Sequence, residues 1–263
     1  MSAEAPAAAR PKVALLVTCL VDLFRPGVGF ATVELLERAG FEVEVPEQTC
    51  CGQPAWNGGD RDGTRAVALQ VLDAFEGYAW VVAPSGSCTG MLKQYPEVFA
   101  AEPALRARAE ALAARCVELT SFLVDQCGLR LPALPGAGGV SVTYHDSCSG
   151  LRELGVQAQP RALLAQAGYA VREMQDPEAC CGFGGLFCVK YPDIADSIVG
   201  RKCADAGATG ATLLVGGDLG CLLHMAGRLS RDGAPVACRH IAELLAPQPG
   251  LPPLARPAQQ KAR

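Results

Sequence analysis

Two Cys-Cys-Gly words, 130 positions apart, constrain the fold of this chain more than any other feature: Cys50-Cys51-Gly52 and Cys180-Cys181-Gly182. Each pair has one further cysteine on either side, at nearly equal distances. The flanking cysteines lie 31 and 32 positions before the pairs and 37 and 40 after them: Cys19 and Cys148, then Cys88 and Cys221. Four thiols that recur at one spacing predict two soft-metal sites built by a duplicated unit.

The two halves also match between the cysteines. The stretch TVELLERAGFEVEVPEQTCCG aligns with RALLAQAGYAVREMQDPEACCG, and a repeat of about 130 residues indicates a domain duplication rather than a solenoid. Residues 128–139 are rich in Pro and Gly, which is typical of a linker. We therefore expect a first lobe at 12–127, a linker at 128–139, a second lobe at 140–246 and a disordered tail at 247–263.

Strand and helix patterns alternate along both halves, which predicts an α/β fold of two similar lobes, each a mostly parallel sheet flanked by helices. The expected strands are 12–18, 41–45, 79–83, 140–144, 169–174, 211–215 and 236–237. The expected helices are 28–39, 61–75, one or two within 103–127, 160–167, 191–206, 219–229 and 239–245. Each repeated cysteine follows a strand, and ligands of such sheets bind at the carboxyl ends of strands, so distant thiols can converge there.

Thiolate is the soft ligand that selects iron–sulfur clusters, zinc or Cu(I). Structural zinc usually takes closely spaced cysteine pairs, and ferredoxins use C-x₂-C-x₂-C, neither of which accounts for these sets. Side chains at neighbouring positions diverge in an extended chain, so an adjacent Cys-Cys pair suits a larger, multi-iron cofactor. The pattern favours iron–sulfur clusters, with zinc binding and a structural or redox-dithiol role as the alternatives.

The remaining cysteines have no counterpart in the opposite half: Cys116, Cys127, Cys188, Cys203 and Cys238. Those in expected helices, at 116, 127 and 203, are interpreted as core residues, and Cys188 has the alternative of an extra ligand near the second pair. His145 and His224 each lie three positions from a repeated cysteine, so each is either a hydrogen-bond donor to the site or, in the favoured interpretation, a capping or core residue. His240 is interpreted as a packing or capping residue.

Composition excludes several classes of function. The chain has 263 residues and a formal net charge of −4, without a basic run, so nucleic-acid binding is not expected. It has no apolar run long enough for a membrane span, and its first apolar run, 13–17, is too short for a signal peptide. We therefore expect a cytoplasmic protein with reduced thiols. The run Gly182–Gly185 lacks the spacing of a nucleotide-binding loop, which disfavours this chain as a hydride-handling subunit.

These words resemble the CCG cysteine-rich domain, present twice. The resemblance covers roughly residues 12–246 and is similar to the lactate utilization protein A family, related to the iron–sulfur subunit of glycolate oxidase and to the CCG-domain subunit of heterodisulfide reductases. It is carried by LLVTCLVDLFRPGVGFATVELLERAGFEVEVPEQTCCGQPAWNGG, YHDSCSGLRELGV, CCGFGGLFCVKYPDI and GGDLGCLLHMAGRLSR.

The resemblance implies a non-autonomous iron–sulfur subunit of an oxidoreductase that oxidises L-lactate to pyruvate with two partner subunits, one of them carrying further clusters. It leaves peripheral membrane association open, and a glycolate-oxidase-type or heterodisulfide-reductase-type subunit and a zinc-stabilised scaffold or thiol sensor remain as alternatives. It also implies one or two [4Fe-4S] clusters per chain, held by two sets of cysteines: Cys19, Cys50, Cys51 and Cys88, and Cys148, Cys180, Cys181 and Cys221.

The chain departs from the full CCG pattern at one position in each half. That pattern ends in C-x-x-C, whereas this chain has Ser85 three positions before Cys88 and Asp218 three positions before Cys221. The replacement of these thiols weighs against an enlarged cluster with five cysteines. A four-cysteine cluster in each half remains compatible with the sequence.

Overall fold

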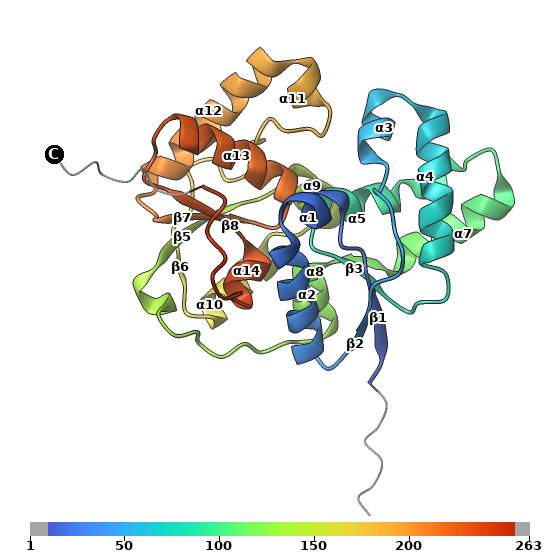
Figure 1. Ribbon diagram of the computed structural model, residues 1–263, viewed down its shortest axis with the longest axis horizontal. Helices are drawn as coiled ribbons and strands as arrows, with labels where there is room; N and C mark the ends of the chain where they lie inside the picture. The colour runs from blue at the N-terminus through green and yellow to red at the C-terminus, as the bar shows by residue number, and fades with distance from the viewer. Residues whose placement is uncertain (1–9, 256–263) are drawn as a thin grey trace, which may run out of the picture.

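Two four-stranded parallel sheets form the framework of the protein (Figure 1). The computed structural model describes residues 10–255. The strand orders are β2-β1-β3-β4 and β6-β5-β7-β8, so the second sheet repeats the topology of the first. The strands are β1 Lys12–Leu15, β2 Glu42–Glu44, β3 Val81–Ala83, β4 Cys116–Glu118, β5 Ser141–His145, β6 Ala170–Val171, β7 Leu213–Gly216 and β8 Ala237–His240. This arrangement confirms the expected duplicated α/β fold.

Helices connect the strands and cover the sheets on both faces (Figure 1). Those of the first half are α1 Cys19–Phe24, α2 Pro26–Arg38, α3 Gln53–Gly58, α4 Arg61–Ala74, α5 Gly86–Lys93, α6 Tyr95–Val98, α7 Pro103–Arg115 and α8 Leu119–Ser121, followed by a π-helical turn at Phe122–Gln126. Those of the second half are α9 Cys148–Leu154, α10 Ala158–Gln166, α11 Phe187–Lys190, α12 Pro192–Ala208, α13 Leu219–Arg231 and α14 Ile241–Leu245.

Local sequence explains where the longer helices begin. The side chain of Asp60 accepts a hydrogen bond of 2.8 Å from the backbone N–H of Gly63 and so caps α4. Pro26, Pro103 and Pro192 occupy the first turns of α2, α7 and α12, where the missing N–H of proline costs no hydrogen bond.

The segment expected to be helical throughout 103–127 contains a strand instead. The helix α7 ends at Arg115, and β4 then pairs with β3, with Cys116 opposite Val81 and Glu118 opposite Ala83. Cys116 is therefore a strand residue and not a helical one. A strand of three residues shows no period of its own, and no Gly or Pro separates it from α7 in the sequence.

The expected disordered tail is ordered up to the last described residue. The backbone N–H of Leu254 donates to the carbonyl of Cys238 at 2.8 Å, and Ala255 forms an antiparallel bridge with the same residue. Ala255 is buried, so apolar side chains anchor this segment on β8. Residues 256–263 of the predicted tail lie outside the described part of the chain.

The two halves share one apolar core. Helix α2 packs against α14, α10 packs against α8, and α5 packs against α9. Buried side chains from both halves, including Leu35, Leu119, Leu163 and Leu245, belong to one continuous cluster. The boundaries 12–127 and 140–246 therefore stay a proposal about the duplication, and the two lobes meet over an extensive apolar contact.

A buried ion pair also joins the lobes. The guanidinium of Arg25, at the start of α2, donates from Nε to Oε1 of Glu243 in α14 at 2.6 Å. The Arg25 side chain is 9% exposed and the Glu243 side chain is 0% exposed. Removal of either partner would leave a buried charge without compensation.

Within residues 10–255, no helix has both the length and the apolar composition that a bilayer crossing requires.

Candidate metal centres

The repeated cysteines lie at the carboxyl ends of the parallel strands. In the first lobe, α1 begins at Cys19 just beyond β1, the pair follows β2, and Cys88 lies in the first turn of α5 after β3. The second lobe places Cys148 at the start of α9 and Cys221 in the first turn of α13 in the same way. The topology thus gathers thiols that are more than 30 residues apart at one edge of each sheet.

All four predicted thiols of the first lobe are neighbours. The sulfurs of Cys19 and Cys50 are 3.5 Å apart, and the thiol of Cys51 contacts those of Cys50 and Cys88. They line a cavity of about 230 Å³. The same contacts recur in the second lobe, where Cys180 contacts Cys148 and Cys181, and Cys181 contacts Cys221: the four predicted thiols are again together.

The first cysteine of each pair is set up to ionise. The thiols of Cys19 and Cys51 donate to Cys50, which lowers the pKa of Cys50 to about 2, and Cys148 and Cys181 lower the pKa of Cys180 to about 2 in the same way. The thiolate is the form of cysteine that binds metals. Both lobes therefore hold a ready anionic sulfur in the middle of a thiol cluster.

A glycine follows each pair because the backbone turns there. Gly52 and Gly182 have φ values of 84° and 79°, and their N–H groups donate to the sulfurs of Cys50 and Cys180 at 3.4 and 3.3 Å. A Cβ on Gly182 would lie 2.8 Å from the carbonyl oxygen of Ala195. Glycine is required here both for the left-handed conformation and for the close approach of α12.

Thr18, directly before Cys19, has the backbone strain that often accompanies functional sites. Its φ is 75° and its ψ is 143°, a conformation that a β-branched residue rarely adopts. Its side chain accepts from the N–H of Val21 and caps α1. The equivalent residue of the second lobe, Ser147, has an ordinary φ of −67°.

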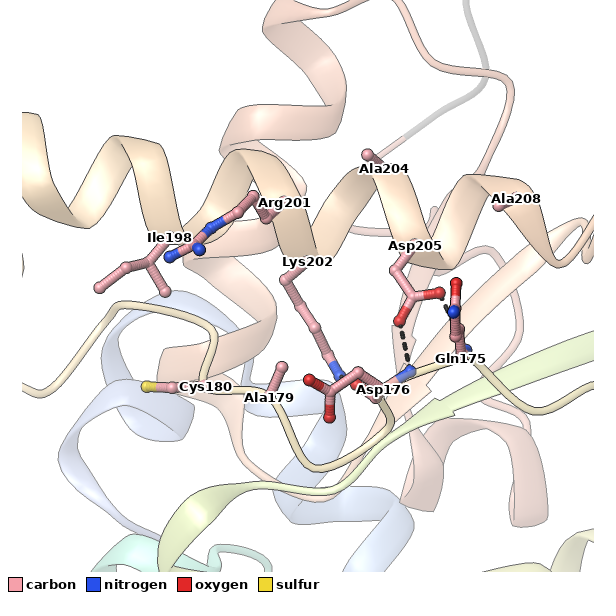
Figure 2. A pocket seen from close by; sticks show the side chains of 10 residues that line it. All are labelled: Gln175, Asp176, Ala179, Cys180, Ile198, Arg201, Lys202, Ala204, Asp205 and Ala208. Carbon is pink, nitrogen blue, oxygen red and sulfur yellow. Dashed lines mark hydrogen bonds between the residues drawn. The ribbon is translucent and has the colours of Figure 1, made fainter.

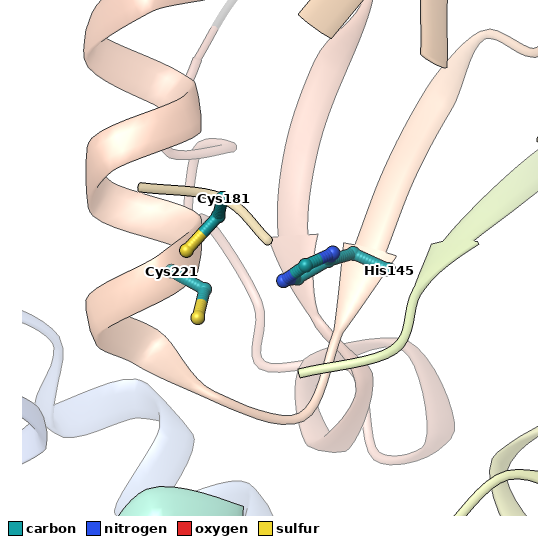
Figure 3. A group of neighbouring side chains, drawn as sticks. All are labelled: His145, Cys181 and Cys221. Atoms are coloured by element: carbon teal, nitrogen blue, oxygen red, sulfur yellow. The ribbon is translucent and has the colours of Figure 1, made fainter. Parts of the chain in front are cut away.

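His145 distinguishes the second site. It ends β5, it is 1% exposed, and one of its ring nitrogens lies within 4.8 Å of the sulfurs of Cys181 and Cys221. In Figure 3 the ring extends toward these two sulfurs. Within the described residues, neither ring nitrogen has a hydrogen-bond partner, and burial lowers the pKa of His145 to about 3. Cysteine sulfurs beside an unpartnered buried imidazole are a donor set that suits a soft metal.

The first cavity is closed by residues of the second lobe. Phe183, Gly185, Asp218, Leu219 and Gly220 line it together with the thiols. The loop that follows the second cysteine pair therefore covers the first site, and the two sites lie on either side of one short segment.

The two positions at which this chain replaces a thiol of the full CCG pattern contact each other. The Oδ2 atom of Asp218 accepts from the Ser85 hydroxyl at 3.3 Å and from the backbone N–H of Ser87 at 2.9 Å. Asp218 precedes α13 but makes no side-chain cap there; it caps α5 of the other lobe. These side chains are thus part of the contact between the lobes, beside the first cavity.

An open groove lies beside the second site. It has a volume of about 650 Å³ and runs between α12 and the loop that leads to Cys180, which is exposed (Figure 2). Lys202 reaches from α12 into this loop and donates to the carbonyls of Asp176 and Pro177 at 2.8 Å each. Burial lowers the pKa of Lys202. This buried cation lies close enough to Cys181 to favour its thiolate.

The other cysteines remain outside the two sets. Cys203 and Cys238 are buried and donate to the carbonyls of Met225 and Leu222, as expected of core thiols, and Cys188 donates to the carbonyl of Gly185. His224 lies 3.0 Å from the carbonyl of Cys181. His240 caps α14 through Nδ1, which accepts from Ala242, and its Nε2 donates to the carbonyl of Pro84.

Sequence reasoning missed Lys202 and the contact of Asp218 with Ser85. Lys202 lies within an expected helix, and a lysine at a position where the periodic pattern requires a buried residue was the available signal. Asp218 and Ser85 stand out in the sequence only as replaced thiols. Their contact spans 133 positions and has no local signature.

Comparison with known proteins agrees with this geometry. The family described as "CCG: Cysteine-rich domain" matches residues 13–93 and 142–226, so fold and site define a protein with two CCG cysteine-rich domains. Lactate utilization protein A of Exiguobacterium sp. is 44% identical over 244 residues, with 89% of this chain and 97% of the relative covered. That of Shouchella clausii is 45% identical over 235 residues, with 89% and 98% covered. The chain belongs to the lactate utilization protein A family.

A solved structure shares the fold alone. A hypothetical protein from Helicobacter pylori superposes with a TM-score of 0.62 at 11% identity, over 90% of this chain and 49% of that chain.

Proposed function

We propose that this chain is the iron–sulfur electron-transfer subunit of a cytoplasmic complex that oxidises L-lactate to pyruvate. The observation that carries the proposal is the gathering of two equivalent sets of four thiols, each around one acidic cysteine. The relatives named lactate utilization protein A support lactate as the substrate of the complex. In this proposal each set holds one [4Fe-4S] cluster, and two partner subunits, one with further clusters, complete the assembly.

The residues would act by holding and insulating the cofactor. Cys50 and Cys180 supply thiolates that are already stabilised by neighbouring donors, and the N–H groups of Gly52 and Gly182 add hydrogen bonds to sulfur, which tune a reduction potential. A bound iron–sulfur cluster supplies reversible one-electron transfer. Oxidation of lactate to pyruvate releases two electrons and two protons, so two one-electron centres match the electron count while a partner removes the protons.

The first test is biochemical. The protein is purified without oxygen and assayed for iron, acid-labile sulfide and zinc, and its EPR spectrum is recorded before and after reduction. We expect iron and sulfide in equal amounts and a signal on reduction. Cys51→Ser and Cys181→Ser should each remove one of two signals, whereas Cys127→Ser, outside both sets, should remove neither. A colourless protein that contains zinc would contradict the proposal.

The second test is physiological. A strain that lacks the gene is grown on L-lactate and on glycolate after complementation with the wild type, Cys50→Ser, Cys180→Ser or Cys127→Ser. We expect loss of growth on lactate alone, restored by the wild type and by Cys127→Ser. Normal growth on lactate without the gene would reject the physiological assignment.

A further inference from the structure

The duplicated fold assigns a counterpart to every residue near the two sites. In the first lobe β1 pairs Ala14 with Val81, and in the second β5 pairs Thr143 with Leu214. Continuing these registers by two residues makes Leu16 the counterpart of His145, and each lies three positions before the first cysteine of its lobe. The buried imidazole of the second lobe therefore replaces a buried, apolar leucine of the first.

An imidazole at this position is costly unless it binds something. His145 is 1% exposed, and in the described part of the chain both Nδ1 and Nε2 are buried without a partner. A buried polar group without a hydrogen bond costs about 1–3 kcal/mol, and nearly all such groups in proteins have a partner. Leucine, as in the first lobe, would fill this space without that cost. The unpartnered nitrogens thus point to a ligand at this site.

The neighbours of His145 identify the chemistry of that ligand. One ring nitrogen and the sulfurs of Cys181 and Cys221 all lie within 4.8 Å of one another (Figure 3). Ligands that share one metal at about 2.0–2.3 Å from it are separated by about 3–4 Å, so only a small closure is required. Imidazole nitrogen and thiolate sulfur are donors that soft and borderline metals accept together.

We propose that His145 is a nitrogen ligand of the metal centre in the second lobe, so that the two centres of this protein differ in their donor sets. The first centre has thiolate ligands, with Leu16 as an inert wall, and the second has a mixed nitrogen and sulfur set. The inference rests on the proposed function only in requiring a metal at the second site, and it holds whether that metal belongs to an iron–sulfur cluster or is a single ion.

The test separates these two claims. Iron and sulfide assays of the anaerobically purified protein decide the proposed function. The donor set is decided on the full-length chain labelled with ¹⁵N-histidine, stripped of metal and loaded with ¹¹³Cd²⁺. The sequence contains only three histidines. We expect one cadmium resonance split by a histidine nitrogen, and loss of that splitting in His145→Leu, the residue that the first lobe already accommodates.

His224→Leu is the matched control, because His224 lies near the same cysteines but contacts the carbonyl of Cys181. It should keep the splitting. Absence of nitrogen coupling in the wild type, or its persistence in His145→Leu, would overturn the proposal. If His145→Leu does not fold, the wild type still decides by the presence or absence of coupling, and His224→Leu together with His240→Leu assigns it.

Discussion

Glu118, at the end of β4, makes the stability of this protein depend on pH in an unusual direction. It is 4% exposed, and its Oε2 atom accepts from the backbone N–H of Thr120 at 2.8 Å, from the Thr120 hydroxyl at 2.6 Å and from the N–H of Ser121 at 3.1 Å. Despite these donors, burial, together with the negative charge of Asp218, raises the pKa of Glu118 from 4.5 to about 7. Desolvation therefore outweighs the hydrogen bonds.

The sign follows from proton binding. Because the pKa is higher in the folded state, the folded state holds its proton where the unfolded state has lost it. The contribution of Glu118 to stability is complete below the unfolded pKa and is lost as the pH rises through the folded pKa. A shift of about 2.5 pKa units at about 1.4 kcal/mol each amounts to about 3 kcal/mol once both states are ionised.

The perturbation is Glu118→Gln, which keeps an acceptor for the three donors and removes the titration. Relative to the wild type, its free energy of unfolding should rise by about 2–3 kcal/mol between about pH 5 and about pH 8, measured by urea unfolding of the reduced, metal-free protein. Glu110→Gln, at an exposed position of α7, should show no such rise. Parallel pH profiles for the wild type and Glu118→Gln would refute the reasoning.

Three further predictions concern the lobe contact and the second site. Arg25→Met should lower the free energy of unfolding by about 3–5 kcal/mol because it leaves the buried Glu243 unpaired, and Arg25→Met/Glu243→Leu should recover most of this loss; additive losses in urea unfolding would contradict it. Gly86→Ala should cost about 1–3 kcal/mol and lower the Tm, since its Cβ would lie 2.8 Å from a backbone atom of α9. Gly138→Ala, which faces open space, is its control. Lys202→Met should lower the reduction potential of the second centre, by roughly 60 mV if the equilibrium changes tenfold; an unchanged potential in an EPR-monitored redox titration would count against a role of this buried cation.

The convergence of the cysteines was predictable because it follows from local patterns. Short apolar strands precede each cysteine, helices separate the strands, and parallel pairing then places all the carboxyl ends at one edge. By contrast, β4 was hidden, since the strand exists only through its pairing with β3. Its three residues carry no alternation that could distinguish them from the end of α7.

Contacts between the lobes were beyond the reach of the sequence. The pair Arg25–Glu243 joins residues 218 positions apart, and Asp218 reaches Ser87 across 131 positions. Such contacts depend on how two finished sheets pack, which no period of 2.0 or 3.6 residues encodes. The sequence places His145 close to Cys148. Only the burial of both its nitrogens, without a partner in the described residues, reveals that the ring needs one.

The second site differs from the first at another buried position, and the two differences act in the same direction. A Cβ on Gly52 would approach Val67, and one on Gly182 would approach Ile198, so these two residues are counterparts, and four positions further on Val71 corresponds to Lys202.

A buried cation and a neutral imidazole both favour the more negative, reduced state of a nearby centre over what leucine and valine would allow. With a cluster in each lobe, we therefore expect the second centre to have the higher reduction potential. Electrons would then pass from the enclosed first site, which the loop after Cys181 covers, to the second site, where the exposed Cys180 borders an open groove. Duplication supplied two similar thiol sets, and substitution at two buried positions gave the pair a direction.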